Sequence, residues 1–173
     1  MIYKVAFLDR DGVINKSNIQ DGYIGRIKYF KFVPGSIKAI SYLKKLNYKV
    51  VVVSNQSGIA RGFFKITDVY KIHKYLQSTL KKKGTKIDKI LFCPFHKDGI
   101  VKKYKKLSKL RKPEIGMFNL INNIWKVDKK QSFIIGDQQS DMQFAKKSGI
   151  KGYYFNKKNL YEFIKSKKKI NNI

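Results

Sequence analysis

Acidic residues are scarce in this chain of 173 residues, which has 11 aspartates and glutamates against 39 lysines and arginines. Cysteine is nearly absent too: Cys93 is the only one, which excludes an intramolecular disulfide framework and fits a reducing compartment. No apolar run approaches the ~20 residues that span a bilayer, and the first residues lack the pattern of a signal peptide. We therefore expect a cytoplasmic protein.

The low acidic content leaves a formal net charge of +28 at pH 7. A nucleic-acid-binding protein would gather its cations on one recognition element, with arginines or aromatic residues between them. Here the lysines are scattered over most segments, which favours a lysine-biased surface that could also steer an anionic substrate. We expect a small-molecule substrate, no nucleic acid or membrane partner, and a monomer.

Short apolar segments alternate with amphipathic ones along the whole chain. The apolar segments predict strands, and the amphipathic segments predict the helices between them. This alternation predicts an α/β fold, a single-domain doubly wound (Rossmann-like) parallel sheet over residues 1–173 with no large cap domain. The strands are expected at residues 5–8, 49–54, 87–92, 132–135 and 152–155.

The ends of the helices carry recognisable signals. Ser36 opens the first helix and Thr67 caps the second. Ser140 and Gln143 form a possible capping box at the start of a later helix, which Gly149 ends. The buried side of the helix before that one is expected to hold Met117, Leu120, Ile121 and Ile124.

Polar side chains follow several of the strands at the point where each strand ends. The carboxyl ends of parallel strands meet at one edge of a sheet, where ligands bind, and the loops at 15–32 and 94–112 are expected to shape that edge. Carboxylates with no histidine between them suit Mg²⁺ better than zinc. A hydroxyl, backbone N–H groups and a lysine suit a phosphoryl group. The candidate residues are Asp9, Asp11, Ser54, Arg111, Lys112, Asp137 and Asp141.

The order of these motifs resembles that of the haloacid dehalogenase (HAD) superfamily of aspartyl-phosphate phosphatases. The matching features are LDRDG at 8–12, Ser54 at a strand end, Lys112 before a helix and GDQQSD at 136–141. The longer stretches FLDRDGVIN, NQSGIARG, RKPEIGM and GDQQSDMQ narrow the resemblance to the heptose bisphosphate phosphatases of this superfamily. No GxxxxGKS/T motif occurs, which excludes a P-loop kinase.

The resemblance implies an HAD-like fold and an activity. The chain would be a phosphoric monoester hydrolase that removes the C7 phosphate of D-glycero-D-manno-heptose 1,7-bisphosphate through an aspartyl-phosphate intermediate. This reaction belongs to the biosynthesis of nucleotide-activated heptose for a surface polysaccharide such as lipopolysaccharide. The anomer that the enzyme prefers stays open, because it depends on the geometry of the pocket.

The resemblance also implies roles for individual residues. Asp9 would be the nucleophile and Asp11 the general acid and base. Mg²⁺ would be bound by Asp9, Asp137 and the backbone carbonyl of Asp11, with Asp141 in support of its water shell. Ser54 and the amide of Asn55 would bind the transferring oxygens, and Lys112 would offset their charge. Substrate contacts are implied for Asp21, Gly22, Tyr23, Asn55, Gln56, Ser57, Arg111 and Gln138, with Arg111 at the phosphate that is not cleaved.

The chain departs from this family at a metal loop. Many members hold a structural zinc there with a C-x-H pair and a later C-x-C pair. The corresponding positions are Cys93, Phe95, Ser108 and Leu110, and His96 stands one place too late. We therefore expect no zinc and a loop held by packing of Phe92, Phe95 and Leu110. At Gln138 the family often has lysine, so one positive charge is missing from the phosphate site.

Two alternative functions stay open. The same chemistry could act on histidinol phosphate or on a nucleic-acid 3′-phosphate end, for which the net charge is the particular support. The chain could also be an inactive HAD-like domain used for binding, although such a domain would not need both Asp9 and Asp11. Of the remaining polar residues, His73 is expected on the surface, and Arg10 on the opposite face of its strand in a structural contact.

Overall fold

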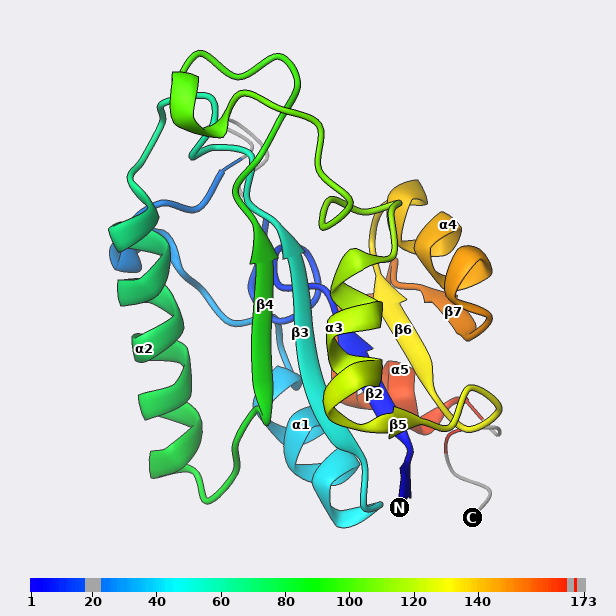
Figure 1. The fold of residues 1–173 in the computed structure, drawn as a ribbon. Coiled ribbons are helices and arrows are strands. Elements are labelled where there is room, and N and C mark those ends of the chain that lie inside the picture. Colours follow the sequence, from blue (N-terminus) through cyan, green and yellow to red (C-terminus); the bar gives the residue numbers. More distant parts are fainter. Residues whose placement is uncertain (18–22, 168–169, 171–173) are drawn as a thin grey trace.

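A five-stranded parallel sheet forms the centre of the fold (Figure 1). The computed structural model describes residues 1–17, 23–167 and 170. The strands β3 and β4 are added in turn on one side of β2, and β6 and β7 are then added on its other side. The strand order therefore reverses between β2 and β6. In spatial order the strands are β4 (Lys89–Cys93), β3 (Lys49–Asn55), β2 (Val5–Leu8), β6 (Phe133–Gly136) and β7 (Lys151–Tyr154).

Helices cover both faces of this sheet (Figure 1). On one face lie α1 (Ser36–Lys45), α2 (Ile66–Lys82) and α5 (Leu160–Lys165), and on the other α3 (Gly116–Ile124) and α4 (Gln139–Ser148). Alternate residues of each strand pack into the two cores: Ala6 and Leu8 face the first set of helices, whereas Val5 and Phe7 face the second. Because both faces are buried, the central strands read as continuous apolar runs.

This architecture confirms the predicted doubly wound parallel sheet, and no large cap is present in the described part of the chain. A short parallel pair that the sequence did not predict, β1 (Ile2–Tyr3) and β5 (Lys126–Val127), lies outside the main sheet. Two short 3₁₀ helices, η1 (Ile27–Tyr29) and η2 (Lys102–Tyr104), occur in the loops. None of the helices in the described ranges is long and apolar enough to cross a membrane.

Two predicted helix starts are wrong. The N-cap of α2 is Lys65 rather than Thr67, because the carboxylate of Asp68 accepts a hydrogen bond from the backbone N–H of Lys65 at 2.9 Å. In the same way α4 begins after Gln138 rather than at Ser140. In both helices an aspartate at the third helical position accepts a hydrogen bond from the backbone N–H of the N-cap residue.

The C-terminal end of α4 agrees with the prediction, because Gly149 forms its C-cap with a φ of 71°. The predicted buried side of α3 is only half right. Met117 and Ile121 are buried, but Leu120 is 45% exposed, since Phe118 occupies the core instead. Ile124 is likewise exposed. The buried stripe of this helix is therefore rotated by about one residue from the predicted position.

The three side chains predicted to hold the loop at 94–112, those of Phe92, Phe95 and Leu110, all make packing contacts. Phe92 packs on the rings of Tyr70 and His73, with centroids 5.6 and 5.4 Å apart, whereas Phe95 packs on Tyr104 at 6.0 Å. Leu110 joins the core beneath α3. Phe92 belongs to β4 and packs on α2, Phe95 packs within the loop, and Leu110 packs next to α3, so the three side chains make three separate contacts.

Candidate active site

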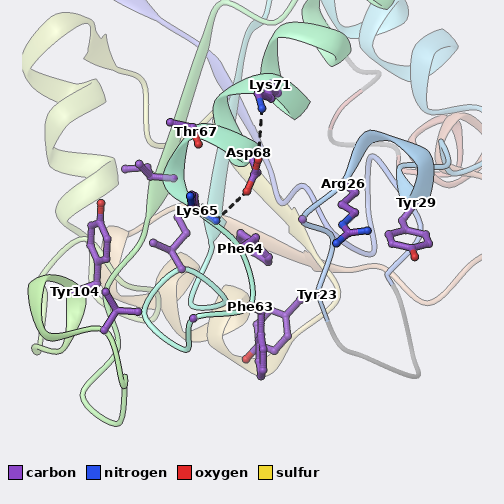
Figure 2. Close-up of a pocket in the computed structure, with 15 residues that line it drawn as sticks. Tyr23, Arg26, Tyr29, Phe63, Phe64, Lys65, Thr67, Asp68, Lys71 and Tyr104 are labelled. Atoms are coloured by element: carbon purple, nitrogen blue, oxygen red, sulfur yellow. Dashed lines mark hydrogen bonds and ion pairs between the residues drawn. The ribbon is translucent and has the colours of Figure 1, made fainter.

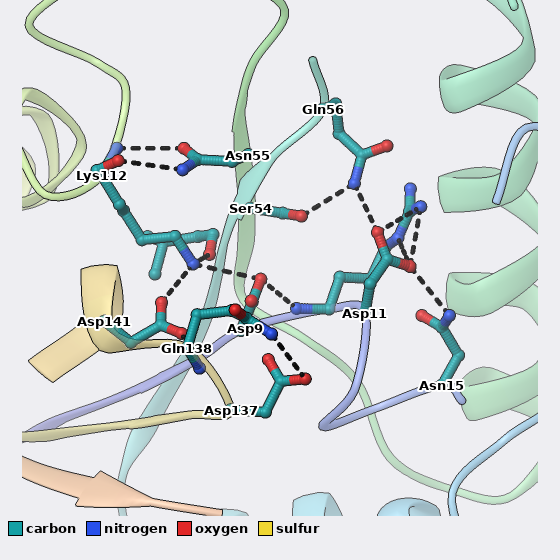
Figure 3. Close-up of polar contacts among 12 residues, drawn as sticks. Asp9, Asp11, Asn15, Ser54, Asn55, Gln56, Lys112, Asp137, Gln138 and Asp141 are labelled. Carbon is teal, nitrogen blue, oxygen red and sulfur yellow. Dashed lines mark hydrogen bonds and ion pairs between the residues drawn. The ribbon is translucent and has the colours of Figure 1, made fainter. Parts of the chain in front are cut away.

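The carboxyl ends of β2, β3 and β6 bring together side chains that are far apart in the sequence (Figure 3). Asp9 comes directly after β2, Ser54 is the last but one residue of β3, and Asp137 comes directly after β6. The backbone N–H of Asp9 donates to the carbonyl of Ile135 at 2.9 Å, which holds the first carboxylate against the neighbouring strand. Asp141 projects into the same place from the first turn of α4.

Lys112 lies at the centre of this group (Figure 3). Its ammonium nitrogen is 3.1 Å from Oδ1 of Asp9 and 2.6 Å from Oδ1 of Asp141, and it donates to the carbonyl of Val53 at 2.8 Å. The side chain of Lys112 is 1% exposed and that of Asp141 is completely buried. Such a buried cation stays in place only because carboxylates face it.

Burial and charge act against each other in this group. Burial raises the pKa of the Asp9 carboxyl to about 7, although Lys112 acts in the lowering direction. Burial lowers the pKa of Lys112, but the carboxylates of Asp9 and Asp141 outweigh that effect and its pKa is raised. A further cation beside Asp9 would favour its ionised form, which is the form that a nucleophile needs.

Asp9, Asp137 and Asp141 form a possible metal site, since one ligand atom from each lies within 4.8 Å of the others. Oδ1 of Asp137 is buried and has no hydrogen-bond partner, and burial raises the pKa of this carboxyl. Gly12, with a φ of 87°, lies so close to the Asp137 carboxylate that a Cβ would collide with it. The donor set is all carboxylate oxygen, which fits Mg²⁺. Asp141 forms the shorter ion pair with Lys112, at 2.6 Å against 3.1 Å for Asp9, and it is completely buried, so it is the least accessible of the three carboxylates.

Asp11 faces away from this group and accepts hydrogen bonds from three other side chains (Figure 3). Arg10 approaches both oxygens of the Asp11 carboxylate through Nη2, at 3.0 and 2.9 Å, and Nε adds a contact at 3.1 Å. Asn15 donates to Oδ1 and Gln56 to Oδ2, both at 2.8 Å. The side chain of Asp11 is therefore held in a fixed orientation, and it is not one of the three clustered carboxylates.

Two consecutive polar residues at the carboxyl end of β3, Asn55 and Gln56, hold their neighbours in place. Gln56 donates through Nε2 to Oγ of Ser54 at 2.9 Å as well as to Asp11, so it connects the two side chains. The side chain of Asn55 donates to the carbonyl of Lys112 and accepts from its backbone N–H, both at 3.0 Å. Asn55 thus fixes the segment that carries the buried lysine. The sequence indicated substrate contacts for both residues but not these hydrogen bonds.

Arg10 and His73 lie elsewhere than predicted. Arg10 is completely buried and makes structural contacts as expected, but with Asp11 and the carbonyl of Ile24, because the strand ends at Leu8 and the alternation of sides ends with it. His73 is not on the surface: it is 8% exposed and its Nε2 lies 3.4 Å from Nη1 of Arg10. Burial and Arg10 lower the pKa of His73 to about 3.

The remaining predicted substrate contacts lie around this centre. The hydroxyl of Tyr23 is 3.5 Å from that of Ser57, which brings residues 23–29 close to the turn after β3. Gln138 is exposed and donates to Oδ2 of Asp137 at 3.4 Å. Arg111 precedes Lys112 directly. Asp21 and Gly22, for which substrate contacts were also predicted, lie outside the described residues.

Tyr23 also lines a pocket of about 1280 Å³ (Figure 2). Its lining is aromatic and charged, and Tyr23 packs on Phe63 with ring centroids 4.9 Å apart. The clustered carboxylates do not line it, so this pocket is separate from them. The residues labelled on its wall are Tyr23, Arg26, Tyr29, Phe63, Phe64, Lys65, Thr67, Asp68, Lys71 and Tyr104.

Comparisons with known proteins agree with this geometry. A family model described as polynucleotide kinase 3 phosphatase matches residues 4–155. A D-glycero-beta-D-manno-heptose-1,7-bisphosphate 7-phosphatase of Rhodopseudomonas palustris is 40% identical over 160 residues, which cover 92% of this chain and 87% of that protein. A D-glycero-alpha-D-manno-heptose-1,7-bisphosphate 7-phosphatase of Photorhabdus laumondii is 36% identical, over 85% of this chain and 79% of that protein.

Solved structures of phosphatases also align with most of this chain. A D,D-heptose 1,7-bisphosphate phosphatase of B. bronchiseptica, complexed with magnesium and phosphate, aligns with a TM-score of 0.79 and 30% identity, covering 95% of this chain and 87% of that one. A HAD-like phosphatase of Mesorhizobium loti aligns with a TM-score of 0.81 and 31% identity, covering 88% of this chain and 72% of that one.

Proposed function

The chain belongs to the HAD-like phosphatase family that these comparisons identify and is a phosphoric monoester hydrolase, and from this premise we propose its substrate and mechanism. The proposed reaction is Mg²⁺-dependent removal of the C7 phosphate from D-glycero-D-manno-heptose 1,7-bisphosphate. It would serve the biosynthesis of nucleotide-activated heptose. Support for the substrate comes from relatives that are 35–42% identical to this chain and are named as D-glycero-D-manno-heptose-1,7-bisphosphate 7-phosphatases. Some of these names specify the beta anomer and others the alpha anomer.

Asp9 is the proposed nucleophile. Oδ1 of Asp9 is held by the backbone N–H of Arg10 at 2.7 Å and by Lys112 at 3.1 Å, which leaves Oδ2 to attack phosphorus. The attack forms an aspartyl phosphate while the bond between phosphorus and the sugar oxygen breaks. Splitting the hydrolysis into two steps matters because phosphate monoesters are among the slowest substrates to hydrolyse without a catalyst.

Asp11 is the proposed general acid and base. It protonates the departing sugar oxygen and then takes a proton from the water that attacks the aspartyl phosphate, which releases phosphate and restores Asp9. Arg10, Asn15 and Gln56 hold the Asp11 carboxylate where the sugar oxygen would lie next to it. These three residues would therefore act by positioning Asp11.

The charge on the transferring phosphoryl group needs cations and hydrogen-bond donors around it. Lys112 supplies one positive charge, and the hydroxyl of Ser54 supplies a donor beside Asp11. Mg²⁺ between Asp9 and Asp137 would neutralise phosphate oxygens and orient them for in-line attack. The single observation that carries this proposal is the buried ammonium group of Lys112, which touches both Asp9 and Asp141 beside the unpartnered oxygen of Asp137.

Phosphate release from a panel of esters in Mg²⁺ buffer tests the substrate. The panel contains both anomers of the heptose bisphosphate, fructose 1,6-bisphosphate, histidinol phosphate and a 3′-phosphorylated oligonucleotide. The proposal expects one heptose anomer to lead by a hundredfold or more in kcat/KM, which corresponds to about 2.7 kcal/mol of transition-state discrimination. Equal rates on all esters would contradict the proposed heptose substrate, although they would still show phosphatase activity.

A second candidate substrate is a nucleic-acid 3′-phosphate end. The description of the matching family model and the net charge of +28 favour it. The panel separates the two candidates, because activity on the oligonucleotide should fall steeply with salt if the lysines bind its backbone. Activity on the heptose substrate should depend far less on salt.

A further inference from the structure

A chain of side-chain contacts leads from the middle of α2 to Asp11. Arg10 lies between the two ends: its Nε and Nη2 donate to the Asp11 carboxylate, and its Nη1 lies 3.4 Å from Nε2 of His73. Nη2 also donates to the carbonyl of Ile24 at 3.2 Å. In the described ranges, His73 is the only residue with a polar contact to Nη1, so this imidazole completes the set of partners of a fully buried guanidinium.

The chemistry of the two groups fixes the form of the imidazole. Arginine carries N–H donors and no acceptor, so its contact with Nε2 is a hydrogen bond only when that nitrogen carries no proton. Burial first, and then the charge of Arg10, lower the pKa of His73 to about 3, so the ring is neutral at pH 7. A neutral ring that accepts at Nε2 holds its single proton on Nδ1. His73 is therefore the acceptor in this contact, and the contact stabilises the guanidinium.

His73 is held by a helix and a strand rather than by a loop. It lies on the buried face of α2 together with Ile72 and Leu76. Its ring packs edge-on against Phe92 of β4, with centroids 5.4 Å apart and ring planes at 69°. A side chain locked by packing on regular elements keeps its position better than one on a loop. The acceptor that faces Arg10 is therefore in a fixed place.

Arg10 needs such an anchor because its own side chain is long. Asn15 and Gln56 each donate to one oxygen of the Asp11 carboxylate. Nη2 of Arg10 approaches both oxygens, at 3.0 and 2.9 Å, so the plane of the guanidinium sets the orientation of the carboxylate. A free arginine side chain has many rotamers, and contacts at its far end reduce them to one. The contact of Nη1 with His73 is such a contact, on the side away from Asp11.

We propose that His73 is a positioning residue for the phosphatase reaction: it accepts a hydrogen bond from Arg10 and thereby fixes the guanidinium that orients Asp11. The inference rests on the proposed function, in which Asp11 is the general acid and base. No motif of the sequence indicated this residue, which was expected on the surface. The contacts of the imidazole are with Arg10 and Phe92 and not with the clustered carboxylates, so its effect reaches the reaction through Arg10.

The experiment compares His73→Leu, which removes the acceptor, with His73→Gln, whose side-chain carbonyl can accept in place of Nε2. The substrate is the ester of the panel that the unchanged enzyme hydrolyses fastest, since every ester of the panel leaves as an alcohol that needs a proton. For His73→Leu we expect kcat to fall about tenfold and KM to change less than twofold. His73→Gln should recover most of the loss. Lys74→Gln, at an exposed neighbour on α2, should match the unchanged enzyme.

A second substrate, p-nitrophenyl phosphate, separates the positioning of Asp11 from general damage to the site. Its leaving group departs without a proton. With enzyme in excess, release of p-nitrophenolate reports only the transfer of the phosphoryl group to Asp9, so this rate in His73→Leu should stay within twofold of the unchanged enzyme. An equal loss on both substrates would show a merely structural role and overturn the proposal. An unchanged kcat on the alcohol ester would overturn it as well.

A double-mutant cycle tests the route through Arg10. Arg10→Lys replaces the planar fork with one ammonium nitrogen, which lacks the separate donors that face Asp11 and His73. Adding His73→Leu to this variant should lower kcat by less than a further twofold, because the contact is already lost. Losses that multiply in full would contradict the route.

Nitrogen-15 NMR of the histidine rings tests the contact in a way that does not depend on activity. The chain has two histidines, and His73→Gln identifies which signals belong to His73. We expect a proton on Nδ1 and none on Nε2 at pH 7. That form supports the contact even if no ester of the panel is hydrolysed, which would be a failure of the proposed function alone. A proton on Nε2 would overturn the inference even in an active enzyme.

Discussion

The ammonium nitrogen of Lys112 lies 2.6 Å from Oδ1 of Asp141, and both side chains are almost completely buried. This pair has a consequence for the division of roles among the carboxylates. Asp141 compensates the lysine and accepts the backbone N–H of Gln138 at 3.1 Å, so its oxygens are already engaged. Asp9 and Asp137 are left as the carboxylates that can turn toward a metal ion and a phosphate.

Replacing Asp141 with Asn should therefore affect both stability and activity. The variant leaves Lys112 buried with a single carboxylate, and breaking a buried ion pair in this way typically costs about 3–5 kcal/mol. We expect the free energy of unfolding in urea to fall by an amount of that order, and kcat to fall at least tenfold because Lys112 is no longer held. Asp98→Asn, at an exposed carboxylate, is the control and should change neither quantity. An unchanged urea midpoint would show that the pair is not stabilising.

Asn55 should prove important for catalysis through Lys112. Asn55→Ala removes two hydrogen bonds to the backbone of Lys112, which lies 57 residues later in the chain. We expect kcat to fall by about tenfold to a hundredfold, since each bond contributes about 1 kcal/mol and the lysine loses its position. Asn119→Ala, on the exposed side of α3, should behave like the unchanged enzyme. If Asn55 only contacted substrate, KM would rise and kcat would stay the same.

Removal of the metal should abolish activity and lower thermal stability. Chelation leaves the carboxylates of Asp9, Asp137 and Asp141 facing one another without a cation. A ligand that binds only the folded state stabilises it by an amount that grows with the logarithm of the ligand concentration above its Kd. We expect the melting temperature to rise with added Mg²⁺ and activity to return. In Asp137→Asn, the rise in melting temperature and the return of activity should both require at least tenfold more Mg²⁺. A melting temperature of the unchanged enzyme that ignores Mg²⁺ would contradict the metal site.

His73 should make the protein less stable in mild acid. Its pKa is about 6.5 in the unfolded chain and about 3 in the folded protein, so between these values the unfolded state binds a proton that the folded state does not. Stability from this residue is complete above pH 6.5 and decreases as the pH falls toward 3, by up to about 1.4 kcal/mol per pH unit. In urea unfolding at pH 7 to 4.5, His73→Gln should show a shallower pH dependence than the unchanged protein. Equal slopes would mean that His73 takes up a proton in the folded state.

Much of the fold could be predicted from the sequence because the signals are local. The four valines of β3 and the short apolar run before Asp9 identify buried strands by composition and length alone. The alternation of strands and helices then requires a parallel sheet, and a parallel sheet brings the residues after its strands to one edge. The meeting of Asp9 with Asp137 follows from those two steps without knowledge of any side-chain contact.

What the sequence by itself determined is therefore the sheet and the set of acidic groups at its carboxyl edge. The tertiary structure alone decided which partner each group has: Lys112 for Asp141, Asn55 for the backbone of Lys112, and Arg10 for Asp11. The reason is physical. Strand formation depends on neighbours along the chain, whereas these hydrogen bonds join segments whose relative position is set only when the loops between them have packed.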